Sequence, residues 1–317
     1  MHGVLTIYKK ELSDHFSSNR FLILFALIAM VSLITAYMAG LNLAKNLEGI
    51  AKPKFVFLLM FTSSGVQFSL VQFIAFFGPL IGLMLGFDTI NRERNEGTLS
   101  KLLSQPIYRD DVVNGKFLAG LTIISLMVIS IILVVSGLGL TMIGVVPGLE
   151  EIFRLTIYVV ISIFYLAFWL GVAILFSIVF RNVATSALAA LAFWIFFSFF
   201  IYLGANAVAS ALVPDAMENS NLMMLKSKIE KAIALTSPLQ LYTDATATII
   251  DPMRRTTRTF VQVGMMEQLS MSRFSGPLPL SQSTLIVLPY IITLIAGAMI
   301  CFAISYVVFM RQEIRSL

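Results

Sequence analysis

Long runs without charged residues alternate with short charged segments along the 317-residue chain. Six runs contain no Asp, Glu, Lys or Arg: Phe21–Ala44, Phe55–Phe87, Phe117–Leu149, Leu155–Phe180, Asn182–Pro214 and Phe274–Met310. A helix needs about 20 apolar residues to cross a hydrocarbon core roughly 30 Å thick, so each run is long enough for one crossing. Because backbone groups in lipid must bond within their own segment, the pattern predicts an all-α polytopic integral membrane protein of about six transmembrane helices.

The charged residues predict how these spans are oriented. Only 12% of the residues are charged, against roughly a quarter in a soluble domain. The net charge of +5 comes from basic residues at span ends, which indicates membrane anchoring and no nucleic-acid partner. With both termini cytoplasmic, the inner side receives Lys9, Lys10, Arg20, Arg92, Arg94, Lys101, Arg109, Lys116, Arg181, Arg311 and Arg315. The two short outer loops receive only Lys45, Lys52, Lys54 and Arg154, which favours this orientation.

The spans divide the chain into five parts. Residues 1–20 are expected to form a short amphipathic helix on the cytoplasmic membrane surface, with Val4, Leu5, Tyr8, Leu12 and Phe16 on its apolar face. Residues 21–205 hold spans one to five, including a charged cytoplasmic loop at 88–116. Residues 206–282 form a helical extracytoplasmic segment, predicted as a cap outside the membrane, 283–310 form span six, and 311–317 are a cytoplasmic tail.

The loop at 88–116 contains a second amphipathic pattern. Gly97 is expected to break the preceding helix and Thr98 to cap a new one. Leu99, Leu102, Leu103 and Ile107 then form its apolar face. Such a helix is suited to a groove of a cytoplasmic partner, or equally to the lipid headgroups, and the pattern alone does not separate the two interpretations.

Three motifs carry a resemblance to a known family. The run Glu96-Gly-Thr-Leu-x-x-Leu-Leu-Ser-x-Pro-Ile-x-Arg109, followed by Gly115-Lys116, resembles the coupling region of the ABC type-2 permease family, closest to its NosY-like branch. The opening Tyr8-Lys-Lys-Glu-Leu-Ser-Asp14 resembles the start of that family, and Leu235-Thr-Ser-Pro-Leu-Gln-Leu-Tyr242 resembles the region before its last span. Together with the six-span order, these motifs cover most of the chain.

The resemblance implies a transport permease subunit, mostly an exporter in this family, that is not itself an enzyme. It implies a second permease chain in a homodimer, a dimer of cytoplasmic ATPase subunits that hold ATP and Mg²⁺, and residence in a prokaryotic cell membrane. No cofactor is expected on this chain, where Gly115-Lys116-Phe117 lacks the Walker A spacing. The residues implied to couple to the ATPase are Glu93, Glu96, Gly97, Thr98, Leu99, Leu102, Leu103, Ser104, Pro106 and Arg109. Those implied in the N-terminal interface helix are Tyr8, Glu11 and Leu12.

Small and aromatic residues mark two further features of the spans. Gly78, Gly82 and Gly86 recur every four residues, a seam that favours close helix packing or a dimer contact; alternatively, the glycines only soften the helix beside Pro79. In the family, spans two and five line the interface between the two permease chains. The aromatic residues that would then face an apolar path are Phe73, Phe76, Phe77, Phe193, Phe197 and Phe200. Contact with lipid is an equally good interpretation of these side chains.

The runs contain no ionisable residue, which disfavours an ion-coupled transporter and suggests a hydrophobic or amphipathic substrate. Methionine is a soft ligand that can select Cu(I), but no His or Cys accompanies the outer methionines, so no metal site is predicted. Those residues are Met217, Met223, Met224, Met253, Met265, Met266 and Met271. The alternatives are an integral membrane enzyme, for which Asp88, Glu93 and Glu96 are the only acidic cluster near a span end, and an assembly or sensory subunit.

Overall fold

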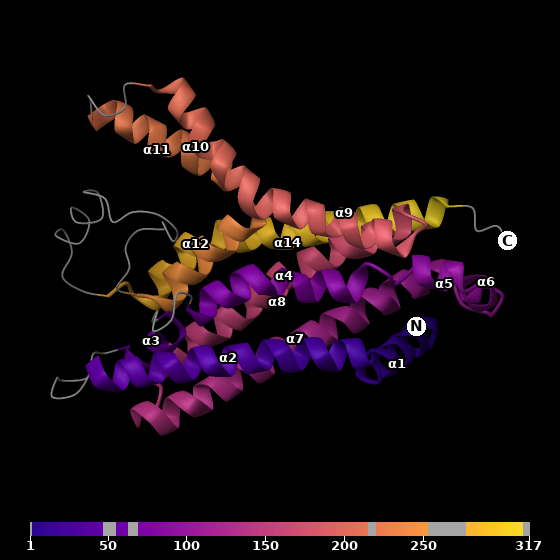
Figure 1. Ribbon diagram of the computed structural model, residues 1–317, viewed down its shortest axis with the longest axis horizontal. Helices are drawn as coiled ribbons and strands as arrows, with labels where there is room; N and C mark the ends of the chain where they lie inside the picture. The colour runs from indigo at the N-terminus through magenta and orange to yellow at the C-terminus, as the bar shows by residue number, and fades with distance from the viewer. Residues whose placement is uncertain (1, 47–54, 63–68, 215–219, 253–276, 313–317) are drawn as a thin grey trace.

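The computed structural model describes residues 2–46, 55–62, 69–214, 220–252 and 277–312. Six of its helices are long and apolar enough to cross a membrane: Asn19–Asn46, Leu70–Asn95, Arg109–Ile143, Leu149–Val179, Val183–Leu212 and Leu280–Arg311. Within the described residues every regular element is helical (Figure 1). The prediction of an all-α polytopic membrane protein is therefore confirmed.

The helices follow one another along the chain with short connections. They are α1 (His2–Phe16), α2 (Asn19–Asn46), α3 (Val56–Thr62), α4 (Leu70–Gly86), α5 (Asn91–Asn95), α6 (Thr98–Leu103), α7 (Arg109–Ile143), α8 (Leu149–Val179), α9 (Val183–Ile195), the π-helix η1 (Phe196–Phe200), α10 (Ile201–Leu212), α11 (Ser220–Ala234), α12 (Pro238–Ile250) and α14 (Leu280–Arg311).

Helix α8 lies at the centre of the bundle, where it packs against α4, α7, α9, α12 and α14. In the most apolar stretches of α4, α7 and α8, at least half of the residues are buried, against 17% in α2, in α9–α10 and in α14. Apolar side chains on these three outer spans are thus left for lipid or for a second protein chain, as expected of membrane helices.

Both termini lie at the same end of the bundle, together with α5 and α6 (Figure 1). We call this the coupling end. The connection between α7 and α8 lies at the opposite end, with α3 and α11. An even number of crossings places the termini together in this way, in agreement with the six predicted spans.

The second charge-free run, predicted as a single crossing, is divided in the structure into α3 and α4. Helix α4 begins at a capping box in which Ser69 and Gln72 exchange hydrogen bonds with each other's backbone. The first turn of α3 is bound by a distant carboxylate, because Phe57 N donates to Glu151 Oε1 at 3.2 Å. These polar contacts at helix ends decide the division, and hydropathy alone does not reveal them.

The segment before the last span is helical, as predicted, but it does not stand apart from the bundle. Ser237-Pro238 ends the α11 pattern because Pro238 begins α12, which is buried against α8 and α14. The buried threonines of α12 bond to their own helix: Thr246 Oγ1 donates to Tyr242 O at 2.8 Å, and Thr248 Oγ1 to Asp244 O at 3.0 Å. Their hydroxyls are thereby satisfied away from water.

The fifth span contains the π-helix η1, which lies between α9 and α10. A π-turn leaves a backbone carbonyl without its usual α-helical partner. Ser237 Oγ, at the start of α12, donates to Phe197 O at 2.6 Å. The irregular turn is therefore joined to the segment that follows it, and α10 and α11 extend away from the other helices beyond this point (Figure 1).

Candidate coupling site

Helices α5 and α6 form a short double turn at the coupling end. Gly97 lies between them with φ of 70°, a left-handed conformation that suits glycine. Thr98 does not cap α6 as predicted; its hydroxyl donates to Glu93 O at 3.2 Å, so it joins α6 to α5. Glu96 lies exposed in an ion pair with Arg92, with Nε and Oε1 2.9 Å apart. Gly97 breaks the helix as predicted.

The apolar face of α6 points toward the protein. Leu99 is only 1% exposed, and Leu102 and Ile107 pack against the core. The expectation that this face lies open for a partner is therefore wrong for Leu99, and the side chain of Leu103 lies outside the described residues. Exposed positions on α6 and just after it are polar residues and a proline: Lys101, Ser104, Gln105 and Pro106.

Helix α1 packs along α7, and the side that it buries differs from the predicted one. Ile7 is buried against Gly115, while Leu5 and Phe16 are exposed. Tyr8 OH donates to Thr122 Oγ1 at 3.2 Å, and Leu12 packs on the core. Exposed Leu5 and Phe16 remain suited to a membrane surface.

Lys116 is the centre of a buried ion-pair cluster that joins α1, α5 and α7. Its Nζ lies 2.7 Å from Glu11 Oε1 and 3.0 Å from Glu93 Oε1, and its side chain is 2% exposed. Lys10 Nζ binds the same two oxygens at 3.2 and 3.1 Å. Glu11 and Glu93, expected to be solvated, are instead the partners of a buried cation. The Glu11–Lys116–Glu93–Lys10 group is called the lysine cluster below.

The charges of the lysine cluster support one another. Burial alone would raise the pKa of Glu11, but the neighbouring ammonium groups of Lys116 and Lys10 hold it below its ordinary value. For Lys10, the carboxylates of Glu11 and Glu93 outweigh burial and raise its pKa. All four side chains therefore stay charged at neutral pH.

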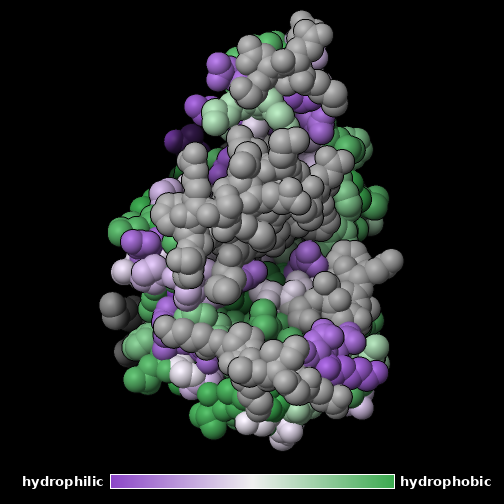
Figure 2. All heavy atoms as spheres, turned by 90° about the vertical axis from the view of Figure 1, so that its left-hand side faces the viewer, coloured by the Kyte–Doolittle hydropathy of each residue, from purple (hydrophilic) through white to green (hydrophobic). Residues whose placement is uncertain are grey.

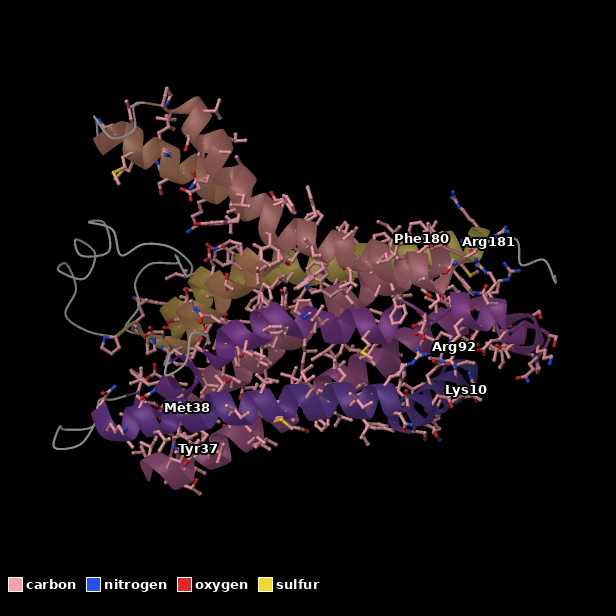
Figure 3. All side chains as sticks on the ribbon, viewed as in Figure 1. Lys10, Tyr37, Met38, Arg92, Phe180 and Arg181 are labelled. Atoms are coloured by element: carbon pink, nitrogen blue, oxygen red, sulfur yellow. The ribbon has the colours of Figure 1, made fainter. Side chains whose placement is uncertain are left out.

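A cleft of about 680 Å³ opens between α1, the start of α2, the end of α4 and the α5–α6 turn. Its wall carries both signs of charge, with Arg20 bound to Asp88 at 3.3 Å and Arg92 bound to Glu96. Phe21, Leu24 and Met84 line its apolar part. Lys10 and Arg92 mark its position, and Arg181 lies at the same end of the molecule (Figure 3).

Neighbouring helices fix the two ends of the α5–α6 segment. Ile90 N and Asn91 N donate to Ser177 Oγ of α8 at 2.9 and 3.2 Å. Arg109, the first residue of α7, donates from Nη1 to Gln312 O at 2.9 Å. The segment is thus held to the bundle by polar contacts on several sides.

The glycines of the predicted seam lie in α4 against α8 of the same chain. A Cβ on Gly82 would approach Leu166 O to 2.8 Å and Leu170 N to 2.9 Å, and one on Gly86 would meet Ala173 Cβ at 2.6 Å. On Gly78 it would meet Leu166 Cδ2 at 2.8 Å. Close packing of the two backbones therefore requires glycine at Gly82, where the obstacle is main chain.

The predicted path aromatics belong to two environments. Phe76 packs edge-to-face on Trp194, with ring centroids 5.4 Å apart, and Phe193 packs on Phe197 with centroids 4.4 Å apart. Phe73 is buried beside Phe77. In contrast, Phe77 and Phe200 are exposed.

Arg154 was expected in an outer loop but lies in α8, fully buried at the end opposite the coupling end. Its Nη1 donates to Ile249 O at 2.9 Å and its Nη2 to Leu278 O at 2.6 Å. Glu150 Oε1, 2.9 Å from Nη2, balances its charge. Viewed from this end, hydrophilic side chains lie on the end face and hydrophobic ones along the flanks (Figure 2). No spacing in the sequence joins Arg154 to residues about a hundred positions away.

Of the outer methionines, Met223 and Met224 are exposed on α11. The other five lie outside the described residues.

The fold and the coupling end together define a multi-pass helical membrane protein whose cytoplasmic helices are fixed for contact with a partner. A model of the ABC-2 family transporter proteins matches residues 5–314. The chain belongs to this family, and it is an ABC transporter permease subunit, a transport subunit rather than an enzyme.

Two bacterial relatives carry the name "Probable ABC transporter permease protein NosY". The protein from Stutzerimonas stutzeri is 31% identical over 129 residues, which cover 41% of this chain and 42% of that protein. The protein from Pseudomonas aeruginosa is 33% identical over 118 residues, which cover 37% and 38%. The similarity thus spans about two-fifths of each relative's length, and it agrees with the NosY-like resemblance of the motifs.

Proposed function

We propose that a separate cytoplasmic ATPase drives this permease through the coupling end, and that the complex exports a hydrophobic or amphipathic substrate. The observation that carries the proposal is the placement of α6. Its apolar side is anchored on the bundle through Leu99, while Lys101, Ser104 and Gln105 are exposed beside the cleft. A rigid element with an exposed polar face transmits force from a bound partner better than a flexible loop does.

In this proposal, α1 is the second docking element. The lysine cluster ties α1 to α5 and α7, so displacement of α6 by the ATPase also displaces α1. ATP and Mg²⁺ are held by the ATPase subunits. The bacterial relatives support residence in a prokaryotic cell membrane.

A second copy of the permease is proposed to pair through α4 and the fifth span. Support comes from the exposed aromatic side chains there, Phe77 on α4 and Phe196, Phe199 and Phe200 on η1. The pairing would enclose an apolar path between the copies, which suits a lipid-like or peptide-like substrate. Transport of only a small hydrophilic ion by the reconstituted complex would contradict this substrate class.

The coupling proposal is tested by co-expressing the chain with the ATP-binding cassette subunit encoded beside its gene. Lys101→Glu reverses an exposed charge on α6, and Lys45→Glu makes the same change on an exposed lysine at the other end of the bundle. We expect Lys101→Glu to reduce co-purification of the ATPase at least fivefold and Lys45→Glu to leave it unchanged. Equal recovery with both variants would refute docking at α6.

A further inference from the structure

Gln312, the first residue after α14, joins four helices at the coupling end. Its side-chain Oε1 accepts a hydrogen bond from Arg94 Nη2 of α5. Its Nε2 donates to Ile178 O of α8 at 2.9 Å, and its backbone carbonyl accepts from Arg109 of α7. The motifs and hydropathy of the sequence do not single out this residue.

The partners of Gln312 are groups that helix ends leave unsatisfied. Ile178 lies in the last turn of α8, where backbone carbonyls have no partner within the helix. Hydrogen bonds from a guanidinium, such as the one from Arg94, are roughly twice as strong as neutral ones. Gln312 therefore replaces water at one helix end and holds an arginine of α5 at the same time.

Helix α5 is gripped on two sides. Glu93 belongs to the lysine cluster with α1 and α7, and the next residue, Arg94, bonds to Gln312 at the end of α14. Consecutive residues on a helix do not face the same way. A displacement of α5 is thus felt on one side by α1 and α7, and on the other by the last span.

We propose that Gln312 is a positioning residue that transmits movement of the α5–α6 turn to α14. The inference rests on the proposed function, because the movement originates in the ATPase. Helix α14 packs on α8 and on the buried α12. A shift of its coupling end would therefore reach the bundle core and the segment preceding the last span.

Three variants separate the bonds that Gln312 makes. Gln312→Leu removes both side-chain bonds. Gln312→Glu keeps acceptor oxygens for Arg94 but loses the donor to Ile178 O, and Arg94→Gln leaves that donor in place. Gln282→Leu is the matched control, since Gln282 is an exposed glutamine at the other end of α14. All four retain the backbone bond from Arg109.

The readout is the movement of α14 in the complete complex with its ATPase. Spin labels are placed at Leu22→Cys and Met310→Cys, both exposed positions, in a Cys301→Ser background, where 301 is the single native cysteine. Pulsed electron resonance measures the distance between the labels without nucleotide and after trapping with MgATP and vanadate. ATP hydrolysis is measured on the same samples.

We expect Gln312→Leu and Arg94→Gln to reduce the nucleotide-dependent distance change at least threefold, with ATP hydrolysis within twofold of the parent complex. Gln312→Glu and Gln282→Leu should keep the change. A full distance change in Gln312→Leu and Arg94→Gln, in a complex that binds its ATPase, overturns the inference alone. Failure of the parent chain to bind the ATPase overturns the proposed function and this inference with it.

Discussion

Lys116 at the coupling end and Arg154 at the opposite end are both enclosed cations, but they are bound by different kinds of partner. Lys116 binds the side-chain carboxylates of Glu11 and Glu93, from two short helices. Arg154 binds Glu150 of its own helix and the backbone carbonyls of Ile249 and Leu278. Side chains can adjust by changing rotamer, whereas a carbonyl moves only with its backbone.

The difference indicates how the two ends serve transport. At the coupling end, a cleft lies beside the lysine cluster, and several ion pairs at its rim are half-exposed. At the opposite end, Arg154 fastens α8 to the end of α12 and to the chain just before α14. We therefore expect the coupling end to rearrange when a partner moves it and the Arg154 end to stay together.

The largest effect is expected from Arg154→Leu, which leaves the carbonyls of Ile249 and Leu278 and the carboxylate of Glu150 without their donor. Removing one partner of a buried ion pair costs about 3–5 kcal/mol. The midpoint of thermal unfolding in detergent should fall clearly. Arg181→Leu, at an exposed arginine, should leave it unchanged, and equal midpoints for the two variants would refute the fastening role.

Lys116→Met should destabilise the chain by about 2–4 kcal/mol, because it leaves Glu11 and Glu93 buried with only Lys10 nearby. Glu11→Leu in the same chain should recover part of this loss, since the protein then buries fewer unpaired charges. Lys9→Met is the control at an exposed lysine of α1. Thermal unfolding again reports the result, and a double variant less stable than Lys116→Met would contradict the cluster.

Between these two ends, the α4–α8 contact is expected to respond to a single methyl group. Gly82→Ala places a Cβ against the backbone of α8 and should cost about 1–3 kcal/mol, the usual penalty for overpacking. Gly137→Ala in α7 meets no atom within 4 Å and should be neutral or stabilising. If Gly82→Ala unfolds at the same temperature as Gly137→Ala, the seam is looser than described.

The smallest effect concerns pH at the coupling end. Burial, with Lys116 nearby, lowers the pKa of His15 below its ordinary 6.5, although Glu11 opposes this shift. The folded chain then binds fewer protons than the unfolded one near this pH, so stability falls as the pH drops below about 6.5. From pH 7 to pH 5.5 the loss should stay under about 1 kcal/mol. His15→Asn should reduce the difference between the unfolding midpoints at the two pH values; an unchanged difference would contradict the assignment.

The sequence predicted features that depend on local spacing. The spans follow from charge-free runs, and Gly78, Gly82 and Gly86 share a helix face because they are four residues apart. The amphipathic pattern of α6 was visible, but its direction was not, since only the packed bundle decides that Leu99 faces inward. Lys116, Arg154 and Gln312 were missed or misplaced for the same reason: their partners come from helices far away in the chain.

The central claim is that the ATPase contacts the coupling end through α6. A photo-crosslinking amino acid placed at Ser104, exposed after α6, should link the chain to the co-expressed ATPase subunit. The same group at Val146, 81% exposed at the opposite end, should give no such product. Crosslinking from Val146 alone, or from both positions equally, would contradict the account.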